Sequence, residues 1–359
     1  MSDIKCDIFD YKRDSLVAQR ELFKDAFPER VGTEAAEESH YLWKFHTFPD
    51  SPVSYEYCAY HENKMVGYYA ALPYHYIING KEMICGMVCD VMTHSSMRGK
   101  GVFTTIGRYA TDDLKNKGLH FTSGYPIRPE VIPGHIKVGW VTTFQMPLYI
   151  KVLKVNSILS KWNLSFASSL INPFIKMMSL YKFTCSSRSF KCETYEVNEI
   201  DNISGYEDFF VKWSSKQSHY LIKSKSFLKW RLSAPAKEYR IICIRKDDNI
   251  IATAIISFSD VKGVPSIGIL DLMVLDGQHS AIKYLFKELE GLAEEKKSEA
   301  IIGMFCKNWA NKYSLIKYGM IKTNIFFTLI LKQLDSSIDF MSIKNEKNWN
   351  LTWIDSDNL

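Results

Sequence analysis

The apolar residues of this chain fall mostly into short runs typical of strands, interrupted by segments with helical spacing. In the clearest helical segment, Val102, Ile106, Ala110 and Leu114 recur every fourth residue, and Gly118 follows. This spacing predicts an amphipathic helix that begins near residue 102 and ends near residue 117. The runs 90–92 before it and 119–124 after it are short and apolar, with turn residues nearby. We therefore expect a strand, a turn, a helix and a second strand.

The turn that opens this helix is rich in glycine, with the sequence Arg98-Gly99-Lys100-Gly101. Glycines let main-chain N–H groups approach an anion, and the positive end of the helix dipole lies at the same place. The turn therefore predicts a diphosphate site. It is neither a P-loop, which needs Gly-Lys-Ser/Thr, nor a dinucleotide fingerprint, because the next glycine is Gly107. The alternative of an ordinary glycine turn stays open.

The chain also repeats itself. Asp90-Val91-Met92 is matched by Asp271-Leu272-Met273 at an offset of 181 residues (271 − 90), and Gly139 is matched by Gly319 at an offset of 180 (319 − 139). Trp43 and Trp230 also correspond, each at the end of a helical pattern, and we expect both in the core. Offsets that agree this closely indicate an internal duplication.

The run after the first strand resembles motif A of the GNAT superfamily of acyl-CoA N-acyltransferases. Arg98, Gly101 and Phe103 fill the slots of that motif, and Phe103 departs from the small residue usual there. Further on, His135 and Gly139-Trp140 lie where GNAT proteins commonly have Tyr-x-x-x-Gly-Phe, so a histidine replaces the tyrosine. The resemblance implies an α/β fold with two tandem GNAT-like domains, each a mixed, mainly antiparallel twisted sheet flanked by helices. By layout it covers nearly all of residues 1–335.

The resemblance also implies a binding site for acyl-CoA between two splayed central strands of the first repeat. Unpaired main-chain N–H groups there would donate to the thioester oxygen as negative charge develops on it. The residues expected to contact acyl-CoA lie in one continuous segment. They are Met92, Thr93, Arg98, Gly99, Lys100, Gly101, Val102 and Phe103.

Only the first repeat is expected to bind acyl-CoA. The second has Asp276-Gly277 in place of the glycine-rich turn, which puts a negative charge where a diphosphate would lie. We expect an N-terminal domain over 1–150, a helical connection packed between the domains over 151–190, a degenerate C-terminal domain over 191–333 and a tail over 334–359.

Composition narrows the function classes. The 359 residues are 46% hydrophobic with a formal charge of +5, and the lysines are dispersed. We therefore expect neither a nucleic-acid partner nor a membrane partner, and a cytoplasmic location, because no apolar run could span a bilayer. None of the eight cysteines forms a C-x-x-C pair, so reduced thiols are favoured and no metal is expected.

Several residues are candidates for catalysis and for acceptor binding. His135 is the favoured acid or base, and Asp90 and His94 are further candidates. Because Asp90 recurs as Asp271 in the repeat without the glycine turn, a structural role for it, tying its strand to the Trp43-Lys44 segment, stays open. The residues expected to contact the acceptor are Tyr74, Tyr125, Trp353 and Asp355.

The layout and the Asp-containing tail resemble tandem GNAT enzymes of bacterial surface-polysaccharide pathways, including O-antigen pathways. This likeness implies transfer of an acetyl or larger short acyl group, such as hydroxybutyryl, to a nucleotide-linked amino sugar, for example a dTDP-3-amino-3,6-dideoxyhexose. Three alternatives stay open: another small amine or peptide as acceptor, transfer from aminoacyl-tRNA, and a non-catalytic CoA-binding module. Association into a homodimer is also open.

Overall fold

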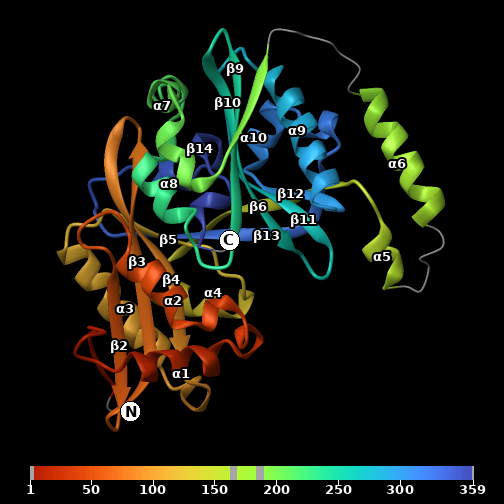
Figure 1. Cartoon of the computed structure of the whole chain (residues 1–359). Helices are drawn as coiled ribbons and strands as arrows, with labels where there is room; N and C mark the ends of the chain where they lie inside the picture. The colour runs from red at the N-terminus through yellow and green to blue at the C-terminus, as the bar shows by residue number, and fades with distance from the viewer. Residues whose placement is uncertain (1–3, 162–167, 183–189, 358–359) are drawn as a thin grey trace.

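The structure is a computed structural model that describes residues 4–161, 168–182 and 190–357 (Figure 1). The elements of the first half are β1 (Lys5–Ile8), α1 (Leu16–Ala26), α2 (Glu38–His46), β2 (Tyr55–His61), β3 (Lys64–Ile78), β4 (Lys81–Thr93), α3 (Val102–Asn116), β5 (Phe121–Gly124), α4 (Ile132–Lys137) and β6 (Val141–Val152). The predicted order of strand, turn, helix and strand is confirmed by β4, α3 and β5.

The second half runs through the same order of elements, with one short strand inserted between its first two helices and a further helix and strand at its end. It contains β7 (Lys191–Tyr195), α7 (Tyr206–Ser214), β8 (His219–Leu221), α8 (Lys225–Arg231), β9 (Glu238–Lys246), β10 (Asn249–Asp260), β11 (Pro265–Val274), α9 (Ala281–Glu295), β12 (Ala300–Met304), α10 (Lys307–Lys312), β13 (Ile321–Gln333), α11 (Phe340–Lys344) and β14 (Trp349–Asn350). The segment from β9 to β13 thus repeats that from β2 to β6, as the sequence offsets predict. The domain boundaries themselves stay a prediction.

Both halves share one mixed sheet, and each half lends its last strand to the other. In the described residues the strand order is β1-β2-β3-β4-β5-β13-β6-β12-β11-β10-β9-β7. β13 pairs antiparallel with β5, β6 pairs antiparallel with β12, and β6 and β13 pair with each other at the centre. The mixed α/β architecture expected from the sequence is therefore present, with the two repeats joined through exchanged strands.

A reciprocal contact between the two tryptophans shows how the halves meet. The rings of Trp43 and Trp230 stack with centroids 5.5 Å apart. Trp43 Nε1 donates to the carbonyl of Trp230 at 2.8 Å, and Trp230 Nε1 donates to the carbonyl of Trp43 at 3.1 Å. Such a self-complementary pair is what a two-fold relation between equivalent surfaces produces. Both side chains are buried, as predicted.

The two faces of the sheet in the first half are covered by different helices. Along β3, Tyr68 and Ala70 belong to the large core, whereas Tyr69 and Ala71 pack with α3 in a separate core. This follows from the alternation of side chains along a strand. α1 packs against β3 and β4, on the face opposite α3. The site described below therefore lies between α3 on one face and the α1–α2 layer on the other.

The connection between the halves is helical, as expected, but it does not lie between them. α5 (Asn156–Ser160) and α6 (Ser168–Lys182) lie beside the body of the molecule, at the side of α9 (Figure 1). Leu170, Phe174 and Met177 of α6 are exposed. The expectation of a packed helical connection was based on its apolar composition, which does not specify what an apolar helix packs against. Residues 162–167 and 183–189, including Cys185, lie outside the described residues.

None of the helices in the described parts of the chain has the length and the apolar composition needed to cross a bilayer.

Candidate active site

The central strands of the first half separate partway along their length. β4 and β5 run parallel and pair only at Cys85, Gly86 and Met87 of β4. β4 continues to Thr93, so the stretch beyond Met87 has no ladder partner on its β5 side among the described residues. Main-chain polar groups facing that gap need another partner. This opening is where the resemblance places the thioester.

A bulge in β4 lies beside the opening. Met92 pairs with Tyr68 and Cys89 pairs with Ala70, so β4 carries one extra residue in this interval. Asp90 lies in the bulge with a φ of +48°, in the left-handed region. Bulges of this kind redirect the strand, and here the bulge marks the point where β4 leaves regular pairing.

An ion-pair network holds the bulge to α2 and to the C-terminal tail. Lys44 Nζ lies 3.0 Å from Asp90 Oδ1 and 3.3 Å from Asp357 Oδ2. Burial would raise the pKa of Asp90, but Lys44, with a contribution from Arg20, holds that pKa below its usual value. The second repeat has a similar arrangement, because Lys223 Nζ lies 2.6 Å from Asp271 Oδ1. The structure thus contains the contact of Asp90 with the Trp43-Lys44 segment considered from the sequence.

The glycine-rich turn leads from β4 into α3. Gly99 has a φ of +76° and Gly101, which caps α3, a φ of +88°, both in the region that favours glycine. Gly101 offers no side-chain cap, so the first N–H groups of α3 have no partner within the helix. The Ser95 N–H and hydroxyl donate to Asp25 of α1 at 2.6 and 2.7 Å, which anchors the start of the turn.

The charges on the turn suit an anionic ligand. Arg98 and Lys100 are exposed, and neither forms an ion pair with a carboxylate in the described part of the chain. Gly67 of β3 brings α3 close to the sheet, because a Cβ there would lie 2.7 Å from Val102 Cγ1. The end of β4 therefore brings together the uncapped N-terminus of α3 and two cations that have no carboxylate partner among the described residues.

Residues 8–140 match the family model described as an acetyltransferase (GNAT) domain. This segment contains the opening between β4 and β5, the bulge and the glycine-rich turn. A search of curated protein sequences finds no match to the chain.

Solved structures of the GNAT class have the same fold over almost the whole chain. A conserved Enterococcus faecalis protein, described as a probable N-acyltransferase, has a TM-score of 0.66 and 11% identity over 93% of this chain and 73% of its own. A GCN5-related N-acetyltransferase from Anabaena variabilis has a TM-score of 0.64 and 11% identity over 92% of this chain and 73% of its own. Saccharomyces cerevisiae N-myristoyltransferase with bound myristoyl-CoA has a TM-score of 0.61 and 10% identity over 100% and 87%. At these identities the likeness shows the fold, and with the family match it supports an acyl-CoA-dependent N-acyltransferase.

Phe103, His135 and Trp140 form an aromatic cluster within the segment that matches the family model. The His135 ring lies 4.9 Å from the rings of both Phe103 and Trp140, edge to face with each. A Cβ on Gly134 would lie 2.7 Å from Phe103, so the large residue in the motif is accommodated by a glycine on α4. His135 is 6% exposed, and burial lowers its pKa to about 4. The imidazole is therefore neutral at pH 7, and its catalytic role stays a prediction.

His94 lies at the entrance to the turn and caps it. Its Nδ1 accepts from the Ser96 N–H at 3.3 Å and lies 2.8 Å from the Ser96 hydroxyl. Lys64 Nζ lies 3.5 Å from Nε2. Both ring nitrogens thus have neighbours within the turn region, and a catalytic role for His94 also stays a prediction.

The four residues predicted to contact the acceptor are spread through the interior between the halves. Tyr74 packs edge to face against Phe227 and Trp230. Tyr125 directly follows β5 at the opening and is buried; burial raises its pKa, with a further contribution from the charge of Asp355.

Asp355 and Trp353 belong to the C-terminal tail, which lies between the two halves. The Asp355 carboxylate accepts from the Thr352 N–H at 2.9 Å and from the Tyr76 hydroxyl at 3.3 Å. Burial raises the pKa of Asp355 to about 6. Trp353 is half-buried, 6.3 Å from the Phe327 ring. Tyr125 and Asp355 thus lie near each other and near the opening, whereas Trp353 faces β13.

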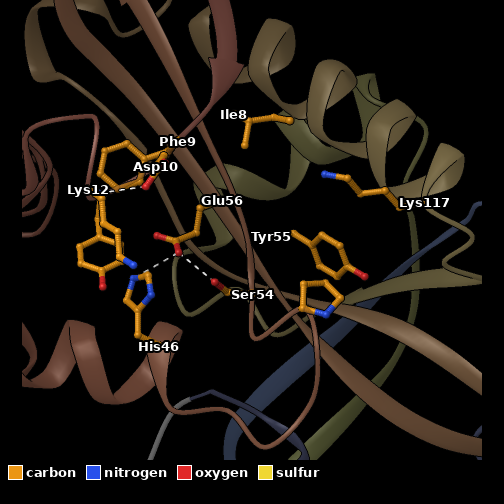
Figure 2. A pocket seen from close by; sticks show the side chains of 11 residues that line it. Ile8, Phe9, Asp10, Lys12, His46, Ser54, Tyr55, Glu56 and Lys117 are labelled. Carbon is orange, nitrogen blue, oxygen red and sulfur yellow. Dashed lines mark hydrogen bonds and ion pairs between the residues drawn. The ribbon is translucent and has the colours of Figure 1, made fainter.

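A separate cavity of about 730 Å³ lies at the outer edge of the first half, near Phe9, His46, Tyr55 and Glu56 (Figure 2). Glu56 Oε2 accepts from the hydroxyls of Tyr41 and Tyr68, each at 2.5 Å, and burial raises the pKa of Glu56. Glu56 pairs across the sheet with Ala70, which pairs with Cys89. The cavity is therefore two strands away from β4 and is distinct from the opening.

Sequence reasoning missed the polar side chains that α1 and α2 place over β4. Arg20 and His40 lie in helical segments whose apolar spacing indicates ordinary core helices, and no motif marks them. The only usable signal is the duplication, which singles out the Trp43-Lys44 segment and hence the helix that carries His40. Within the described residues, no three His, Cys, Asp or Glu side chains are grouped so as to hold a metal ion.

Proposed function

We propose that this chain transfers an acyl group from acyl-CoA to the primary amine of a nucleotide-linked amino sugar. The observation that supports acyl-CoA binding is the combination of a strand opening beside β4 with a glycine-rich turn that leads into the uncapped N-terminus of α3. Gly99, Gly101 and the first turn of α3 would hold the diphosphate, with Arg98 and Lys100 supplying positive charge.

The proposed chemistry is direct attack of the amine on the thioester. Main-chain N–H groups of β4 near Met92 would donate to the carbonyl oxygen as it becomes negative, which is the largest electrostatic contribution that such a site offers. The thioester is already reactive, so holding the amine beside it supplies much of the remaining acceleration. The C–N bond forms, the C–S bond breaks, and CoA leaves as the thiol.

The acceptor half of the proposal is based on the layout and the tail. Tyr125 directly follows β5 at the opening and Asp355 lies near it, both buried. We propose that the Tyr125 ring and the Asp355 carboxylate border the sugar, since an aromatic ring with a carboxylate is a combination that can bind one. Transfer from aminoacyl-tRNA would require a basic groove for the RNA, whereas binding of a nucleotide-linked amino sugar does not.

The test is a thiol-release assay with several acyl-CoAs against a panel of amino sugar nucleotides, free amino sugars and short peptides with a free N-terminus. We expect turnover with an amino sugar nucleotide at rates well above those of the other amines. Turnover only with the peptides would show that the acceptor is a peptide amine and not an amino sugar. Stabilisation by CoA in a thermal-shift assay without thiol release from any amine would identify a CoA-binding module instead.

A further inference from the structure

Three unpartnered polar atoms lie in the α1–α2 layer that covers β4. They are Gln19 Nε2, Arg20 Nη2 and His40 Nδ1, each buried and without a hydrogen-bond partner among the described residues. Gln19 is fully buried and Arg20 is 8% exposed. Buried polar groups are rarely left without partners, so a cluster of them indicates a place where a polar ligand binds.

The charges around these atoms place the cluster beside the bulge. His40 lies one helical turn before Lys44 on α2, and residues four apart share one face of a helix. Lys44 contacts Asp90. Arg20 lies over the Tyr41 ring at 5.1 Å, and its Nη1 donates to the Ala35 carbonyl at 3.2 Å. The free imidazole nitrogen and the free guanidinium N–H therefore belong to the layer directly above the extra residue of β4.

We propose that His40 is the general base for the acceptor amine, and that Arg20 and Gln19 bind an oxygen of the acceptor close to that amine. This inference rests on the proposed acyl transfer. It narrows the acceptor to an amine with a neighbouring hydroxyl, carbonyl or phosphoryl oxygen, because the two free groups are N–H donors.

The surroundings keep His40 in the form that can accept a proton. Burial lowers its pKa to about 4; Lys44 and Arg20 also lower it, while Asp90 and Glu34 oppose them. The ring is thus neutral above about pH 5. The other candidates are less available, since the Asp90 and Asp357 carboxylates share Lys44 and His135 is enclosed by two aromatic rings.

The proton balance of the step is simple. The amine nitrogen attacks the thioester carbon and becomes positively charged, which makes its proton far more acidic than in the free ammonium ion. His40 takes that proton as the C–N bond forms. When the C–S bond breaks, the imidazolium returns the proton to the sulfur through solvent, so that the products are an amide and the CoA thiol.

The test compares His40→Ala with His46→Ala, a matched change on the same helix. His46 lies at the cavity of Figure 2, with its Nε2 3.1 Å from the Tyr41 hydroxyl. We expect His40→Ala to lower kcat by about 100-fold or more, with an unchanged thermal shift by acyl-CoA and with rescue by added imidazole. His46→Ala should keep kcat within about threefold and show no rescue.

A readout without turnover separates this role from a structural one. In protein labelled with ¹⁵N-histidine, the His40 signals, assigned by their loss in His40→Ala, should shift when the acylated product is added, while those of His46 should not. A His40→Ala protein with wild-type kcat, or with no imidazole rescue, would overturn the base assignment and leave acyl transfer standing. A wild-type protein that releases no thiol with any amine would overturn both.

Discussion

Gly101→Asp is the most direct test of the proposed diphosphate site. Gly101 is the N-cap of α3, and a Cβ at this position would meet nothing within 4 Å. The change therefore causes no clash. At a φ of +88°, a residue with a side chain lowers the stability of the fold by about 1 kcal/mol relative to glycine. The Asp carboxylate can accept hydrogen bonds from the first turn of α3, which offsets part of this loss. We expect a folded protein with a slightly lowered melting temperature.

The effect of Gly101→Asp on the affinity for CoA should be much larger than its effect on stability. The new carboxylate would occupy the N–H donors that the diphosphate needs and would lie about 5 Å from it. At an effective dielectric constant of about 20, each pair of unit charges at that distance repels by about 3 kcal/mol. This corresponds to a loss of at least about 100-fold in affinity. Isothermal titration calorimetry with CoA at two salt concentrations measures this loss, which should shrink at high salt.

The second repeat supplies the matched control. Gly277 also has a positive φ, +79°, and a Cβ there would likewise meet nothing within 4 Å. Gly277→Asp should therefore cost a comparable amount of stability and leave CoA affinity unchanged. If Gly101→Asp bound CoA with the wild-type Kd, or if both variants lost affinity equally, the assignment of the site to the turn before α3 would be wrong.

Three further predictions concern catalysis and stability. His135→Ala should lower kcat less than His40→Ala does, because the His135 ring is enclosed between Phe103 and Trp140; a loss of kcat as large as that of His40→Ala would make His135 the acid or base instead. The pKa of His135 is about 4 in the folded protein and about 6.5 in the unfolded chain. The free energy of unfolding should therefore fall by about 3 kcal/mol between pH 6.5 and pH 4 on account of this residue. His135→Phe should flatten this part of the pH profile in denaturant titrations, and an unaltered profile would contradict the lowered pKa. Trp43→Phe and Trp230→Phe should each lower the free energy of unfolding by about 1 kcal/mol, because each loses one hydrogen bond. The double variant should lower it by less than the sum of the two, since the two rings are in contact.

Local patterns predicted the elements that build the proposed donor site. The four-residue spacing from Val102 to Leu114 produces α3, which spans Val102–Asn116, and glycine at position 101 is needed for the left-handed cap. Both features depend on residues close together in the chain. The repeat was also readable, because the offsets between matching residues agree to within one position. In the structure, Asp90 and Asp271 each have a lysine partner.

Contacts between distant segments could not be read in the same way. The apolar pattern of β6 and β13 specifies strands, but it does not specify that each pairs with the other half. The position of Glu56 in an otherwise apolar strand gives no sign of its two tyrosine donors on α2 and β3. The same applies to His40, whose neighbours come from α1, α2 and β4.

The strand exchange explains how the repeat without the glycine-rich turn still contributes to the surroundings of the proposed site. β13 supplies the antiparallel neighbour of β5, which is the strand that leaves β4 at the opening. The tail then returns to both halves: Thr352 donates to Asp271 at 2.8 Å, and Asp357 shares Lys44 with Asp90. The second repeat thus borders the opening on one side and leads the chain back to the bulge on the other. The second repeat keeps all of these contacts although it lacks the glycine turn that we propose as the diphosphate site.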